Sequence, residues 1–266
     1  MTSSILKIVP AAILVAALLP AQQPASPAVQ QPTPAAAQTA AAPPAAEAKS
    51  WRAGVKFSGQ LLNMFNQSQL DTFDSIPWKF TSANTTDISN HLGFGLTAGF
   101  DVSSRVSLNV DILYRRAGYR SGLEITEGED NPDTDQDDRK FTTGFEQTKV
   151  DYWDLPVTLR LHDGPATDRV RGFFELGGTL RHAASVRTYS ETGTPGAVSV
   201  VDATPAKVSN PNTFGGTVGA GWDWRTARGI NFVPQLRYTY WMKPVFNSPT
   251  TRSARSQIEI LVGITF

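Results

Sequence analysis

Cysteine is absent from this 266-residue chain. Its absence excludes a thiolate nucleophile, a zinc–thiolate site, a disulfide scaffold and a lipid attached through a cysteine. Histidine is also scarce, and His91, His162 and His182 lie far apart without the spacing of metal ligands. We therefore assign no catalytic, cofactor-binding or metal-binding residue from the sequence and expect no cofactor.

An excess of charge of either sign is missing as well. Twenty-four basic residues balance 24 acidic ones, so the bulk charge gives no reason to expect a nucleic-acid partner. Methionine is rare, with 3 residues, whereas glycine is plentiful, with 21. This composition favours β-sheet over helix.

No hydrophobic run is long enough for a membrane-spanning helix. The run "IVPAAILVAALLP" (8–20) offers about a dozen apolar residues, whereas a spanning helix needs about 20. Lys7 precedes the run and small residues follow it near Ala21, as in a cleaved signal peptide. We predict a signal peptide over residues 1–21, with an uncleaved anchor helix as the alternative.

Residues 22–50 contain little except Ala, Pro and Gln and carry almost no charge. Proline blocks helix and ladder pairing, and the segment has nothing large to bury. We predict a disordered or polyproline-like tether, which spans on the order of 90 Å when extended. An inert spacer is the expected role, and contact with the cell wall is the alternative.

From Trp51 onward, apolar residues alternate with polar ones in eight segments. Successive side chains of a strand point to opposite faces, so each segment is predicted to be a strand with one apolar face. The connections alternate between long and short, as in an up-and-down sheet, and closure removes the sheet edges. We predict an all-β, eight-stranded antiparallel barrel over residues 51–266. The predicted strands span about 51–62, 91–102, 106–118, 148–161, 169–184, 212–225, 229–242 and 254–266.

The second face of these strands carries glycines and charged residues, six cations and five anions in number. The charged residues are Lys56, Asp111, Arg115, Asp154, Arg160, Arg171, Glu175, Arg181, Asp223, Arg237 and Glu259. A soluble ligand-binding barrel places such a face outside, whereas a membrane barrel places it around the lumen.

Two features favour the membrane barrel over the soluble one. The predicted strands, of about 12–16 residues, exceed the roughly 9–11 that cross a bilayer at a tilt. Aromatic residues of the apolar face gather near the strand ends, as interfacial girdles do, with Trp51 and Phe266 at one end and Tyr114 and Trp153 at the other. An exported soluble barrel that holds an apolar ligand remains the alternative.

Several stretches carry a family resemblance: "DILYRRAGY" (111–119), "YWDLPVTLRL" (152–161), "FGGTVGAGWDW" (214–224), "QLRYTYW" (235–241) and "LVGITF" (261–266). In this ordered set the chain resembles the small outer-membrane β-barrel family, often called PorT-like or OmpX/OmpA-like. The resemblance implies a barrel in the outer membrane of a diderm bacterium, in contact with membrane lipid and lipopolysaccharide. It also implies that the barrel-assembly machinery reads the last strand, which ends in Phe266.

Three loop regions raise further hypotheses. In "EITEGEDNPDTDQDDRK" (124–140), Asp133, Asp135 and Asp137 alternate as at the start of a calcium loop, but the usual glycine and distal glutamate are missing. A solvated acidic loop is favoured, and divalent-cation binding stays open. The apolar residues of 70–80 and 243–246 predict either a lid over the barrel mouth, which is favoured, or a partner contact. The residues concerned in the first segment are Phe73, Ile76, Trp78 and Phe80.

The predicted function is non-enzymatic and is carried by the long loops, in surface interaction or envelope integrity. No motif joins His91 or His182 to a nucleophile, so both are interpreted as polar residues of the rim. A narrow solute pore is the alternative. We expect a plugged lumen instead, because eight strands leave space that side chains roughly fill. Loss of an interior charge, as in Glu259→Ala, is then expected to destabilise the barrel.

Overall fold

The structure is a computed structural model that describes residues 51–75, 78–133, 137–194, 197–203 and 206–266. The predicted signal peptide and tether lie outside these ranges. No helix long and apolar enough to cross a membrane occurs in the described ranges. The strands are β1 (Trp51–Gln60), β2 (Phe65–Asn66), β3 (Ser68–Ser75), β4 (Trp78–Asp87), β5 (Leu92–Asp101), β6 (Val106–Glu127), β7 (Lys140–His162), β8 (Val170–Thr194), β9 (Ala197–Ala203), β10 (Asn212–Arg225), β11 (Asn231–Trp241), β12 (Arg252–Ser253) and β13 (Ser256–Thr265).

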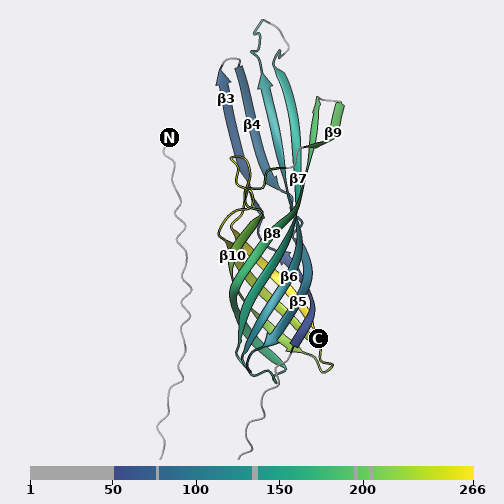
Figure 1. The fold of residues 1–266 in the computed structure, drawn as a ribbon. Coiled ribbons are helices and arrows are strands. Elements are labelled where there is room, and N and C mark those ends of the chain that lie inside the picture. Colours follow the sequence, from purple (N-terminus) through teal and green to yellow (C-terminus); the bar gives the residue numbers. More distant parts are fainter. Residues whose placement is uncertain (1–50, 76–77, 134–136, 195–196, 204–205) are drawn as a thin grey trace, which may run out of the picture. The chain divides into compact units, whose positions relative to one another are not determined.

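Eight of these strands form a closed ring (Figure 1). Around the ring each strand pairs antiparallel with the next in the order β1, β5, β6, β7, β8, β10, β11 and β13, and β13 pairs again with β1. Since each ring strand lies beside its neighbour in the chain, the connectivity is up-and-down. The predicted eight-stranded antiparallel barrel is confirmed.

The two faces of the wall are also as predicted. Every one of the eleven charged residues assigned to the second face is buried, and Glu175 is 0 % exposed. Apolar side chains of the first face point away from the lumen, and Leu96 is 62 % exposed. A soluble barrel with an apolar interior is therefore wrong for this chain, because its apolar face would meet water. In a hydrocarbon solvent the same face is favourable, and a closed ring leaves no unpaired edge.

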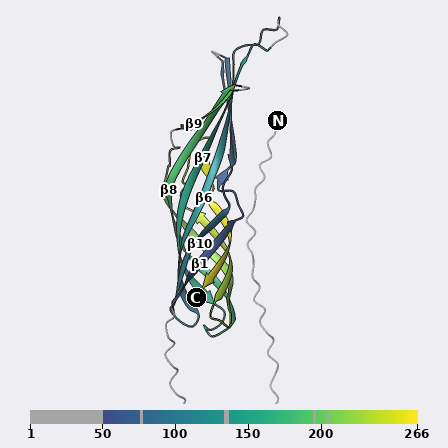
Figure 2. The ribbon, with the colours of Figure 1, turned by 90° about the vertical axis from the view of Figure 1, so that its right-hand side faces the viewer.

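The long connections differ from the prediction, because strands rather than loops occupy much of them. β6, β7 and β8 run well beyond the predicted ends at about residues 118, 148 and 184. Beyond the barrel, β4 takes the place of β5 beside β6, pairing Asp87 with Tyr119 and Lys79 with Glu127. Together with β3 and β9 these strands form a six-stranded projecting sheet in the order β3, β4, β6, β7, β8, β9 (Figures 1 and 2).

Two prolines interrupt the barrel ladder without changing its register. Between β6 and β7 the pairing passes from Val110–Val157 to Leu113–Asp154, so the pair that would contain Pro156 is skipped. Pro234 has the same effect between β10 and β11. Proline has no N–H to donate. At each proline the strand therefore keeps its ladder pairing on the other side only, as Pro156 with Thr179 and Pro234 with Val262. A register shift between β7 and β8 lies elsewhere, where Asp151 pairs with Ser185 and Tyr152 with Ala183.

Candidate functional site

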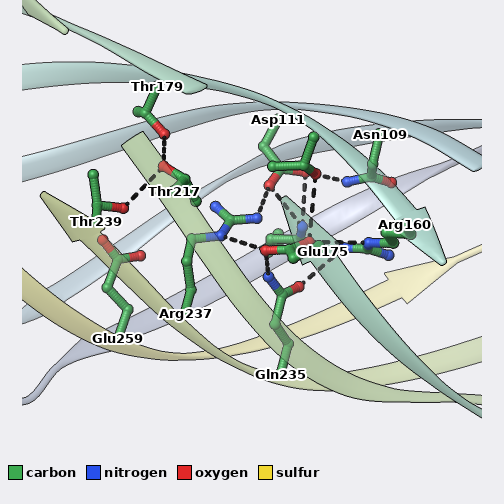
Figure 3. Close-up of polar contacts among 12 residues, drawn as sticks. Asn109, Asp111, Arg160, Glu175, Thr179, Thr217, Gln235, Arg237, Thr239 and Glu259 are labelled. Carbon is green, nitrogen blue, oxygen red and sulfur yellow. Dashed lines mark hydrogen bonds and ion pairs between the residues drawn. The ribbon is translucent and has the colours of Figure 1, made fainter. Parts of the chain in front are cut away.

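The middle of the lumen is crossed by a network of ion pairs (Figure 3). Asp111 of β6 binds Lys56 Nζ at 2.7 Å and Arg237 Nη2 at 2.8 Å. Glu175 of β8 binds Arg237 Nε at 2.9 Å and Arg160 Nε at 3.1 Å. Each carboxylate thus joins two cations, and five strands of the ring are connected through the interior.

A second group of charges lies toward the projecting sheet. Arg115 binds Glu259 at 2.6 Å and Asp154 at 2.8 Å, and Arg181 binds the same Asp154 through Nε and Nη2, each at 2.7 Å. Gln257 connects the group by accepting from Arg181 and donating to Glu259. Bidentate guanidinium–carboxylate pairs of this kind fix geometry as well as charge.

A third group closes the short-turn end of the lumen. Asp223 binds Arg52 at 2.6 Å and Arg171 at 3.0 Å, and Arg52 also binds Asp101 at 2.5 Å. All eleven predicted interior charges therefore take part in ion pairs. Sequence parity placed these residues inside, but it did not identify Arg52 and Asp101 as members.

Glycines make room for the long charged side chains. Gly219 of β10 pairs with Arg237 on one side and with Glu175 on the other, so these two side chains meet over a residue that has none. Lys56 lies between Gly95 and Gly263 in the same way. The glycines and the charged residues, which the sequence placed on one face, thus alternate across neighbouring strands.

These charged side chains are shielded from water in the middle of the lumen. Arg237 and Lys56 are each 1 % exposed although they stand in the middle of the barrel. A water-filled passage would have to run past these side chains and expose them. Buried ion pairs of this kind contribute little net stability, but an uncompensated partner is costly.

An apolar cap covers the lumen on the side of the projecting sheet. It consists of Met64, Phe65, Ala117, Tyr119, Val150, Tyr152, Val245 and Phe246. The ring centroids of Phe65 and Tyr119 lie 5.0 Å apart, and Phe246 lies 5.8 Å from each. Val245 and Phe246 of segment 243–246 thus form part of the predicted lid.

Phe73 and Phe80 of segment 70–80 do not belong to the cap. This segment forms most of the β3–β4 hairpin, where Phe73 is 58 % exposed and Phe80 is 37 % exposed. The predicted lid is wrong for Phe73 and Phe80, because pairing of β4 with the extended β6 carries these residues away from the mouth. Ile76 lies outside the described residues.

The comparisons with known proteins agree with this architecture. A family model described as "Outer membrane protein beta-barrel domain" matches residues 36–247. The chain belongs to this outer-membrane β-barrel family. It is accordingly a protein of the bacterial outer membrane, as the resemblance in the sequence implied. No curated protein sequence matches the chain at a significant level.

Two solved structures are similar to this family member. Neisserial surface protein A is 10 % identical with a TM-score of 0.35, and the match covers 82 % of this chain and 98 % of that one. The attachment invasion locus protein Ail of Yersinia pestis, solved with the heparin analogue sucrose octasulfate, is 11 % identical with a TM-score of 0.32. That match covers 81 % of this chain and 99 % of Ail.

The barrel does not bring the predicted rim histidines to a nucleophile. His91 is exposed, and His182 is exposed with its Nδ1 2.7 Å from Asn212 Oδ1. A pair that the sequence did not reveal lies at the short-turn end, where Ser107 Oγ is 3.0 Å from His162 Nε2. Both residues are buried, and no described group orients the other ring nitrogen of His162. This pair therefore lacks the third member of a hydrolytic triad.

In the acidic loop between β6 and β7, an arginine of the loop forms an ion pair with one of the aspartates. Arg139 binds both oxygens of Asp137, at 2.8 and 2.6 Å. This contact lowers the pKa of the Asp137 carboxyl. Asp135 lies outside the described residues, and within the described ranges no three acidic or histidine side chains group as metal ligands. Cation binding by this loop stays an open hypothesis.

Proposed function

We propose that this protein is a non-enzymatic outer-membrane anchor that displays a β-sheet at the cell surface for interaction with a partner. In this proposal the short turns face the periplasm and the projecting sheet lies outside. The barrel spans the membrane, and the sheet supplies the contact surface. Envelope integrity is the alternative role, served by the barrel itself.

One observation carries the proposal. β6, β7 and β8 are single strands that belong to both the barrel and the projecting sheet, so the sheet continues the wall of the barrel. These three strands continue well past the part of the barrel whose apolar wall requires a membrane. A barrel that served only as a pore would need neither this sheet nor a lumen filled by ion pairs.

Two further partners belong to the proposal. Membrane lipid and lipopolysaccharide would surround the apolar wall. The barrel-assembly machinery would read the last strand, whose Phe266 is 68 % exposed beside β1. In support, the backbone of Phe266 pairs with that of Ala53, by a 2.9 Å hydrogen bond from the Phe266 N–H to the Ala53 carbonyl and a return bond. Its ring is therefore free to face lipid or a recognition site.

Cysteine labelling in intact cells tests the orientation. The chain has no native cysteine, so Phe73→Cys in the hairpin and Arg228→Cys in a short turn each create one target. A membrane-impermeant maleimide is expected to label the first variant in intact cells and the second only after lysis. Labelling of Arg228→Cys alone in intact cells would reverse the orientation.

Binding assays test the surface role. Purified protein is applied to host-cell surfaces, lipopolysaccharide and envelope proteins. A change on one face of the hairpin, Phe73→Ser with Phe80→Ser, is expected to weaken binding to the partner. The matched control, Thr72→Ser with Thr81→Ser, changes the opposite face of the same strands. Equal binding by both variants and by the wild type would show that this face of the hairpin is not the contact surface.

A further inference from the structure

Four exposed cations lie on the outward face of β6, β7 and β8, where these strands leave the barrel. They are Arg116, Arg120, Lys149 and Arg187. Nearer the barrel the same face is apolar and ends in aromatic residues, with the rings of Tyr114 and Trp153 5.2 Å apart. The outward face therefore changes from apolar to cationic within a few residues on three adjacent strands.

Two of these cations are placed against each other. Lys149 and Arg187 are direct cross-strand partners between β7 and β8. Directly opposed residues have their Cβ atoms about 4.5–5.5 Å apart, and like charges in such pairs are destabilising. An anion between the two side chains would remove this repulsion.

The protein's own carboxylates on this face include Asp151, which also interacts electrostatically with Arg187, and Glu191, the register partner of Phe145. Asp151 binds Arg116 Nε at 3.0 Å and accepts from Tyr114 Oη at 2.7 Å. Among the described side chains, no carboxylate forms an ion pair with Arg120, Lys149 or Arg187.

Aromatic rings hold two of the cations at the surface. The Arg120 guanidinium carbon lies 4.3 Å from the centre of the Phe145 ring, and Lys149 Nζ lies 5.6 Å from that of Tyr189. Cation–π contacts leave the outer side of each charge available to an anion. The four side chains therefore form a cationic surface on which Arg120 and Lys149 are positioned by aromatic rings.

The group begins at the level of the headgroup layer and extends beyond it. Tyr and Trp mark the membrane interface, and each residue of a strand advances about 3.3 Å. Arg116 and Arg120 follow Tyr114 by two and six residues, which places them about 7–20 Å farther along the tilted strand. The headgroup region begins at the girdle and is roughly 5–8 Å thick on each side of the hydrocarbon core.

We propose that Arg116, Arg120, Lys149 and Arg187 form a binding site for the phosphate groups of an anionic lipid in the outer leaflet. The charges bind the headgroup while its acyl chains lie on the apolar wall directly below. This continuity favours a lipid over a soluble anion. The assignment rests on the orientation proposed above, in which this end of the barrel is outside.

Native mass spectrometry of the purified full-length protein tests the site. Protein in detergent is mixed with equal amounts of bisphosphorylated lipid A and of the same lipid with both phosphates removed. The wild type is expected to retain the phosphorylated lipid at least about tenfold better. Lys149→Gln with Arg187→Gln is expected to reduce this preference to less than about twofold.

A matched variant and a soluble anion complete the experiment. Arg105→Gln with Arg228→Gln removes two exposed cations at the short-turn end and is expected to keep the preference. Heat-modifiable gel migration confirms that each variant is folded. Equal retention of the two lipids by the wild type, or an equal loss in the control variant, would overturn the proposal. Displacement of the lipid by inorganic phosphate at equal concentration would assign the site to soluble anions instead.

Failure of the lipid site and failure of the surface role are distinguishable. In detergent the lipid reaches both ends of the barrel, so the result does not depend on orientation in the cell. Cysteine labelling of the hairpin reports orientation without any lipid preference.

Discussion

Arg237 and Glu175 form an ion pair across two strands that are not neighbours. Arg237 lies on β11 and Glu175 on β8, and Gly219 of the intervening β10 is the register partner of both. The 2.9 Å contact between Arg237 Nε and Glu175 Oε1 passes over this glycine inside the lumen. At this level of the barrel, β11 thus contributes a cation, β10 contributes no side chain and β8 contributes an anion.

Removal of both charges is expected to cost less than the sum of the two single removals. Glu175→Gln leaves Arg237 and Arg160 without their shared carboxylate, and a broken buried pair costs about 3–5 kcal/mol. In a double-mutant cycle with Arg237→Met, we expect a coupling energy of about 0.5–3 kcal/mol. Urea unfolding in lipid vesicles measures these free energies. Strictly additive effects would show that the two residues do not interact.

An exposed carboxylate supplies the control for this cycle. Glu124 lies in the projecting part of β6 and is exposed. Glu124→Gln is expected to change the free energy of unfolding by no more than about 0.5 kcal/mol. A loss comparable with that of Glu175→Gln would attribute the effect to charge in general rather than to the lumen.

Gly219 is expected to tolerate no side chain. A Cβ at this position would lie 2.8 Å from Glu175 Oε1 and 2.8 Å from the Leu236 carbonyl oxygen. Gly216 of the same strand points outward, and a Cβ there would meet nothing within 4 Å. Gly219→Ala is expected to lower the free energy of unfolding by about 1–3 kcal/mol, as overpacking does. Gly216→Ala is expected to leave it within about 0.5 kcal/mol, and equal losses would contradict the packing argument.

Two tryptophans are expected to report opposite environments. Trp222 is 61 % exposed on the outward face, whereas Trp241 is 2 % exposed and donates its indole N–H to Gln257 at 2.9 Å. In variants that keep one of the six tryptophans, brominated lipids should quench Trp222 fluorescence strongly and Trp241 fluorescence weakly. The reverse order would place the polar face in lipid.

Local alternation was enough to predict the barrel wall. The position of Lys56, Glu175 or Arg237 inside follows from parity alone, because the period of a strand is two. Their partners could not be predicted in this way. Arg237 meets Glu175 only after the registers of β8, β10 and β11 are set, and long connections separate several of these strands.

The projecting sheet escaped prediction for a different physical reason. Its strands carry polar residues on both faces, as in "SQLDTFDS" of β3. Both faces meet water, so neither shows the apolar alternation that marks a half-buried strand. The pairing of Ser107 with His162 was hidden as well, because the register between β6 and β7 is not set by a short turn.

The purified protein is expected to form no stable large channel in a planar bilayer. Two barriers stand in series along the lumen, the apolar cap and the ion-pair network below it. Val245→Ser with Phe246→Ser disrupts the cap but leaves the network, so this variant is also expected to stay closed. Large stable currents from the wild type would refute a filled lumen. Currents from the cap variant alone would make the cap the only barrier and would mean that ions can pass between Lys56, Asp111 and Arg237.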